Sequence, residues 1–218
     1  MDACTTVERV VRASYGRLVA FLAARSRDVA AAEDALADAF EAALVTWPRT
    51  GVPEKPEAWL LVTARGRLID AARHARVHAE AVPSLLVASA EAEEMAESRL
   101  ELPDERLKLM FVCAHPAIDA NVHTPLMLQT VLGLDAARIA AAFLVQPAAM
   151  GQRLSRAKAK IRDARVAFEL PSAADLPERL DAVLGAIYAA YGTGWEDISG
   201  ADRRHSSLRR ALRRPAYS

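Results

Sequence analysis

Apolar residues recur every three or four positions through most of this chain, and alternating runs of strand length do not stand out. Such spacing gives each helix one apolar face, which is buried when helices pack together. With 218 residues, 52% of them hydrophobic, the chain can fill one large core or two small ones. The sequence therefore predicts an all-α protein.

The first third of the chain contains signals for the ends of three helices. Thr5 and Glu8 have the spacing of a capping box, and Asp28 suits the N-cap of a second helix, which Pro48 closes. The segment 48–56 holds three prolines and Gly51, so it reads as a loop before a helix that begins at Pro56. The expected helices are residues 5–26, 28–48 and 56–77, and they form a first domain, residues 1–78.

The pattern weakens from residue 79 to 101, where glutamates accumulate between alanines and serines, and we interpret this stretch as an acidic linker. A second helical domain is expected over residues 102–168. Its predicted helices are residues 102–113, 124–132, 135–143 and 147–165. The remainder, 169–218, reads as a C-terminal extension in which a helix over 177–191 is followed by an arginine-rich tail. That helix places Leu180, Leu184, Ile187 and Tyr191 on one face.

The most informative segment is LDAARIAAAFLVQPAAMGQRLSRAKAKIRD, from Leu134 to Asp163. It has the length of a helix-turn-helix, in which Asp135 caps the first helix and Pro147 starts the second. Residues 147–165 hold six basic side chains and one acidic side chain, a bias that a merely solvated face does not need. The polar face predicted to meet DNA carries Gln152, Arg153, Arg156, Lys158 and Lys160.

An acidic ridge is expected on the helix over 28–48. Asp34, Asp38 and Glu41 lie at i, i+4 and i+7, opposite a stripe that contains Leu36 and Trp47. A ridge of this kind is more often a solvated face than a binding site, so its spacing alone does not establish a partner.

The net charge limits how DNA could be bound. Basic and acidic residues number 28 each, so only local patches can attract nucleic acid. The two cysteines, Cys4 and Cys113, cannot form a disulfide framework, and neither a signal peptide nor a membrane span of about 20 apolar residues is present. We therefore expect a cytoplasmic protein that does not bind membranes.

Signals for catalysis and for metal binding are weak. Cys113, His115 and His123 lack the paired spacing of a structural zinc site. Neither a G-x-S-x-G motif nor a glycine-rich phosphate loop is present, and nothing pairs a nucleophile with a base. We expect no catalytic residues, no metal and no cofactor, and thus a protein that is not an enzyme.

The helix-turn-helix resembles the sigma4 domain of sigma-70-like factors, whose segment typically reads LSxxEIAexLGISxGTVKSRLxRAxxxLR. Departures occur at Leu144, Ala149 and Gly151, where that family usually has glycine, threonine and lysine. The resemblance implies binding to the −35 element of promoters. The matching residues are Ile139, Ala140, Arg153, Leu154, Arg156, Ala157, Ile161 and Arg162.

Two N-terminal segments resemble the sigma2 domain of the same family. AEDALADAFEAALVTWP, residues 32–48, is similar to AEDLVQETFLxAW, which implies that Asp34, Asp38 and Glu41 dock on the coiled coil of the largest polymerase subunit. PEAWLLVTARGRLIDAAR, residues 56–73, is similar to FxAWLxxIARNxxxDxxRR, the element that meets the melted −10 region. There Gly66 replaces the usual asparagine. The implied DNA-binding residues are Arg65, Arg67, Arg73 and Arg76. An extruded base would also need a pocket, and loop 48–55 is a better candidate for it than Trp59.

Together these resemblances imply a sigma factor of the extracytoplasmic-function (ECF) type, from a subgroup with a C-terminal helical extension. Core RNA polymerase and promoter DNA are then the expected partners, and an anti-sigma or other regulatory protein is compatible with the resemblance. Two alternatives stay open: a helix-turn-helix regulator of another class, and a helical adaptor that never touches DNA.

Overall fold

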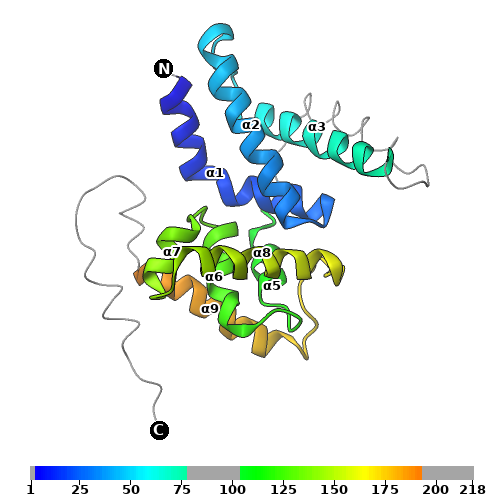
Figure 1. The fold of residues 1–218 in the computed structure, drawn as a ribbon, viewed down its shortest axis with the longest axis vertical. Helices are drawn as coiled ribbons and strands as arrows, with labels where there is room; N and C mark the ends of the chain where they lie inside the picture. The colour runs from blue at the N-terminus through cyan, green and yellow to red at the C-terminus, as the bar shows by residue number, and fades with distance from the viewer. Residues whose placement is uncertain (1–2, 78–103, 193–218) are drawn as a thin grey trace. The chain divides into compact units, whose positions relative to one another are not determined.

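A computed structural model describes residues 3–77 and 104–192, and in these residues all regular secondary structure is helical (Figure 1). The predicted all-α class is confirmed. The chain divides into two compact units, unit 1 (Met1–Glu105) and unit 2 (Arg106–Ser218). The whole of the predicted linker, residues 79–101, falls in the part that the structure does not describe.

Unit 1 is a three-helix bundle of α1 (Ala3–Ser26), α2 (Val29–Thr50) and α3 (Pro56–Val77), in which each helix contacts the other two. The rings of Trp47 and Trp59 meet edge to face, with centroids 5.4 Å apart. This geometry is favourable for aromatic pairs and ties α3 to α2. The bundle buries Leu18, Phe21, Leu22, Leu36, Ala43, Trp47 and Leu60.

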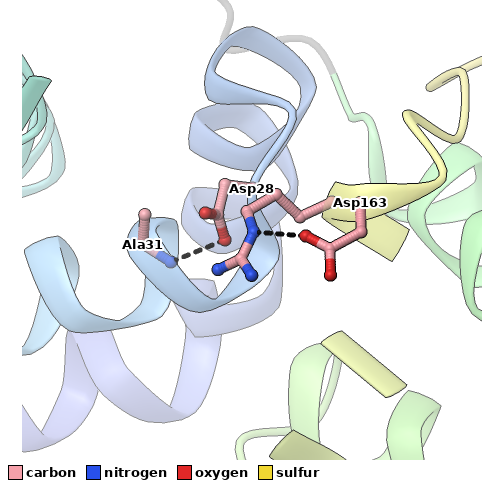
Figure 2. A network of polar contacts seen from close by, with 4 residues as sticks. Asp28, Ala31 and Asp163 are labelled. Atoms are coloured by element: carbon pink, nitrogen blue, oxygen red, sulfur yellow. Dashed lines mark hydrogen bonds and ion pairs between the residues drawn. The ribbon is translucent and has the colours of Figure 1, made fainter. Parts of the chain in front are cut away.

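The boundary between α1 and α2 confirms one predicted cap, whereas the start of α1 does not follow the prediction. The Asp28 side chain accepts a hydrogen bond from the Ala31 N–H at 3.0 Å, as an N-cap should (Figure 2). The predicted capping box at Thr5 is wrong, because α1 already begins at Ala3 and an N-cap residue must precede its helix.

The predicted end of α2 at Pro48 is also wrong. The helix continues to Thr50 and stops at Gly51, whose φ of 86° suits glycine and whose N–H bonds to the Trp47 carbonyl. A proline in the last turn removes only the hydrogen bond to the Leu44 carbonyl. Leu44 lies on the solvent side of α2, with 45% of its surface exposed, so water can replace that bond.

Unit 2 is built around α6 (Ala120–Thr130), which contacts four other helices. These are α5 (Arg106–Cys113), α7 (Ala136–Ala142), α8 (Pro147–Asp163) and α9 (Leu176–Gly192). The predicted start of α6 at residue 124 is four residues late, because Asp119 caps the helix by accepting from the Asn121 N–H at 2.9 Å. The core of unit 2 contains Leu109, Leu126, Met127, Ile139, Met150, Leu154 and Ile161.

The last described helix, α9, packs by its less apolar face. The buried Arg179 donates from Nη2 to the Phe111 carbonyl of α5, and Val183 and Ala186 lie in the core. The apolar stripe that the sequence shows on α9 is exposed instead: Leu184 is 51% and Tyr191 is 87% exposed. Packing of α9 on α5 and α6, and not the number of apolar residues, decides which face is buried.

His115 follows α5 and lies close to Arg179. Its Nδ1 accepts a hydrogen bond from the Ala117 N–H at 3.1 Å, a role that only the neutral ring can fill. Burial lowers the pKa of His115, and the charges of Arg179 and His123 lower it further, whereas Asp175 acts in the opposite direction.

This lowered pKa leads to a prediction of pH dependence. Because the folded state disfavours protonation of His115, its contribution to the free energy of unfolding is present above the ordinary pKa of 6.5 and is lost as the pH falls below that value. We expect urea denaturation to show lower stability at pH 5.5 than at pH 7.5. His115→Gln should reduce this difference, and an unchanged difference would assign the pH effect to other groups.

Candidate functional site

Helices α7 and α8 form the predicted helix-turn-helix. Asp135 caps α7 by accepting from the Arg138 N–H at 2.8 Å, and Pro147 occupies the first turn of α8. Ile139 from α7 and Leu154 from α8 are buried where these two helices meet. The short helix, the turn at 143–146 and the longer helix therefore have the arrangement that the sequence predicts.

The turn between these helices contains a strained residue. Leu144 has a φ of 56°, and the next N–H, that of Val145, bonds to the Ala140 carbonyl at 3.0 Å. This is the pattern of a Schellman motif, in which glycine is preferred at the left-handed position. Leu144 is 77% exposed, so its side chain gains little packing in return for the strain.

We predict that Leu144→Gly stabilises unit 2. A left-handed conformation costs a non-glycine residue roughly 1–2 kcal/mol, and glycine removes this cost. Glycine also loses more conformational entropy on folding, which cancels about half of the gain in stability. Thermal or urea denaturation should therefore show a gain of about 0.5–1 kcal/mol. The matched variant Leu144→Ala keeps the strain and should gain nothing, so equal stability of both variants would contradict this explanation.

The outer surface of α8 is basic, as predicted. Met150, Leu154, Ala157 and Ile161 face the core. Arg162 pairs with the only acidic side chain of the helix, Asp163, at 3.0 Å (Figure 2). Of the predicted DNA-binding residues, Gln152, Arg153, Arg156 and Lys160 are exposed and Lys158 is half-buried.

The predicted acidic ridge lies on the solvent side of α2. Asp34, Asp38 and Glu41 are exposed. The same row continues one helical turn further to Val45, which is 58% exposed, and then to Pro48. Val45 was not among the predicted ridge residues, although its position four residues after Glu41 already places it on the ridge.

The arginines predicted for α3 do not share one face. Arg65 is half-buried, and Arg73 is exposed and lies 3.7 Å from Asp70. At about 100° per residue, Arg67 lies on roughly the opposite side of α3 from Arg65. The helical positions of residues 73 and 76 are within about 80° of that of Arg65. The side chain of Arg76 is outside the described part. Trp59 is half-buried against Trp47, as expected of a packing residue.

Other groups considered in the sequence have structural contacts. Cys113 is buried with its Sγ 3.6 Å from the Thr130 hydroxyl, and the Nε2 of His123 lies 3.1 Å from the Ile118 carbonyl. Among residues 3–77 and 104–192, no three histidine, cysteine or acidic side chains are placed to hold a metal ion. Within the same residues, no helix combines the length and the hydropathy that crossing a bilayer requires.

Comparison with known families identifies the N-terminal bundle. The family model for sigma-70 region 2 matches residues 10–77, which contain most of α1 and all of α2 and α3. The chain is a sigma-70-like protein. Its region 2 therefore includes the acidic ridge of α2 and the arginines of α3.

Two curated relatives extend the similarity of this sigma-70-like chain. An uncharacterized protein of Rhizobium meliloti (strain 1021) is 39% identical over 180 residues, covering 81% of this chain and 43% of that protein. A probable RNA polymerase sigma factor, RfaY, of Xanthomonas campestris pv. campestris is 30% identical over 162 residues, covering 71% of this chain and 39% of that protein. The chain thus spans about two fifths of the length of these relatives. No solved structure matches it.

These comparisons bear differently on the two units. Region 2 lies within unit 1, and the family match ends before unit 2 begins. The match to the first relative is longer than unit 1, so similarity reaches into unit 2 as well. The helix-turn-helix, residues 136–163, lies outside the region 2 match.

Proposed function

We propose that this chain is an ECF-type sigma factor that binds core RNA polymerase and directs it to specific promoters, without catalysing a reaction itself. The observation that carries the proposal is the match of residues 10–77 to sigma-70 region 2, in a bundle that exposes an acidic ridge on α2. The name of the Xanthomonas relative, a probable RNA polymerase sigma factor, supports the same role.

Polymerase binding is assigned to the ridge of α2. Asp34, Asp38 and Glu41 would attract a basic surface and orient the encounter, because complementary charges raise association rates. Val45 continues the ridge with an exposed apolar side chain, and burial of such groups slows dissociation. The ridge therefore combines charge steering with an apolar anchor.

Contact with the melted −10 element is assigned to α3 and to the loop before it. Arg65 and Arg73 lie within about 80° of one another around α3 and would neutralise phosphates of a single strand. The same role is proposed for Arg76, whose side chain lies outside the described part. Capture of an extruded base also needs a pocket or a stacking surface. The loop at 51–55, between Gly51 and Pro56, lies beside this helix and is our candidate for that pocket.

Contact with the −35 element is assigned to α8. Its exposed cations and Gln152 follow the turn of a helix-turn-helix, the position from which a recognition helix enters the major groove. Promoter DNA lies in the bacterial cytoplasm, so this function implies that the protein acts there. An anti-sigma or other regulatory protein is a compatible further partner.

The two other function classes make different predictions in one experiment. The full chain is mixed with bacterial core RNA polymerase, separated by gel filtration, and used for run-off transcription from a library of genomic fragments. A sigma factor co-elutes with the polymerase and starts transcription at discrete sites. A regulator of another class binds DNA without restoring initiation, and an adaptor does neither, so either result would refute the proposal.

A further inference from the structure

The cations of α8 lie in two rows. The first row contains Arg153, Arg156 and Lys160, and the second row contains Lys158 and Arg162. At about 100° per residue, the two rows occupy opposite flanks of the helix, roughly 170° apart. Between them, and roughly opposite the buried residues, runs an outward strip of Ala148, Gln152, Ser155 and Ala159.

This two-sided arrangement fits a groove with two negatively charged walls. The major groove of B-DNA is about 12 Å wide, admits one helix and is bordered by a phosphate backbone on each side. Cations on opposite flanks can reach both backbones at once, whereas a flat acidic partner would meet only one row. The outward strip then faces the edges of the bases.

The strip offers little for base recognition apart from one residue. Ala148, Ser155 and Ala159 are small, which lets the helix backbone approach the groove floor. Gln152 is exposed and has an amide at the end of a flexible chain, the group that pairs with both N6 and N7 of adenine. Near the end of α8, the carboxylate of Asp163 pairs with Arg162 at 3.0 Å, so a phosphate contact by Arg162 would replace this ion pair.

We propose that Gln152 is the base-reading residue of α8 and that it specifies adenine, while the two rows of cations hold phosphates of any sequence. The inference rests on the proposed DNA-binding function of unit 2. It separates selectivity, carried by one neutral side chain, from affinity, carried by the arginines and lysines.

Gly151 supplies a matched variant with an opposite expected effect. Apart from the adjoining backbone of α8, a Cβ atom added there meets no atom of the described residues within 4 Å, and the position lies on the same flank as Lys158 and Arg162. Gly151→Lys should therefore extend the second row by one phosphate contact. Replacement of a helical glycine also favours the helix, so the fold should be retained.

The test uses the full chain and two duplexes: one selected by the wild-type protein from a random pool, and one with the same bases scrambled. Gln152→Ala should lose roughly tenfold of the preference for adenine at one position and keep wild-type affinity for the scrambled duplex. Gly151→Lys should bind both duplexes more tightly, with a salt slope steeper by about one. Neither variant should change the circular dichroism spectrum.

A change in the DNA provides the decisive control. When 7-deazaadenine, which lacks the N7 acceptor, replaces the selected adenine, wild-type binding should weaken and Gln152→Ala binding should not. If both proteins respond equally, or if Gln152→Ala keeps its full preference for adenine, Gln152 does not read the base and only this inference fails. If the wild-type chain binds neither duplex in a salt-dependent manner, the proposed DNA-binding function of unit 2 fails.

Discussion

Reversing two charges on the ridge, with Asp34→Arg and Asp38→Arg together, is expected to weaken binding of core RNA polymerase by roughly tenfold or more. Both side chains are exposed, and arginines in their place would repel the basic surface that the ridge is proposed to meet. Like charges placed opposite one another at an interface cost several kcal/mol. Titration of labelled polymerase with the full chain, at low and at moderate salt, measures the effect.

The fold should not change, because exposed substitutions away from the core usually alter stability by less than about 0.5 kcal/mol. Reversal of another exposed acidic residue, Glu8→Arg on α1, is the matched control and should leave polymerase binding unchanged. Wild-type affinity of the double variant would remove the ridge from the docking surface. Because Glu8→Arg changes the net charge by half as much as the double variant, a loss of binding free energy in the control about half as large would point to net charge instead.

Trp47→Ala is expected to have the largest effect on stability. Trp47 is 2% exposed and packs edge to face on Trp59, so its removal leaves a large cavity between α2 and α3. Truncating a buried tryptophan costs about 3–5 kcal/mol, which is comparable to the whole stability of many small domains. Urea denaturation followed by circular dichroism should show unit 1 unfolding at much lower denaturant concentration, and polymerase binding should fall with it.

Two milder variants separate the loss of buried ring volume from the loss of the indole N–H and from substitution at an exposed position of α2. Trp47→Phe keeps most of the ring volume. It also removes a buried indole Nε1–H that has no hydrogen-bond partner among residues 3–77 and 104–192, so it should cost much less than alanine. Val45→Ala, at a 58% exposed position of the same helix, should stay within about 0.5 kcal/mol of wild type. A loss below about 1 kcal/mol for Trp47→Ala would show that the tryptophan pair does not hold the bundle.

The two proposed interaction surfaces have opposite charge within a chain whose net charge is zero. The acidic ridge lies on α2 of unit 1, and the two rows of cations lie on α8 of unit 2. Separate surfaces of this kind let one chain bind a basic protein and an acidic nucleic acid. Overall charge would have predicted neither partner.

Much of this structure could be predicted from local signals. The cap at Asp28, Pro56 at the start of α3, and the Asp135 and Pro147 signals of the helix-turn-helix depend on hydrogen bonds and dihedral angles within a few residues. The buried faces of α2 and α8 could be predicted from the spacing of apolar residues, because one face of each helix is clearly more apolar than the other. Sequence alone therefore placed the ridge and the basic face.

The tertiary structure decided the points at which local signals compete. Pro48 is tolerated inside α2 because Leu44, whose carbonyl it leaves without a helical partner, lies on the solvent side of the helix. The packed face of α9 is set by Arg179, Val183 and Ala186 against α5 and α6, although its other face is richer in large apolar residues. Hydrophobic spacing shows that a helix has an apolar face, but whether that face is buried depends on which neighbours the rest of the chain brings to it.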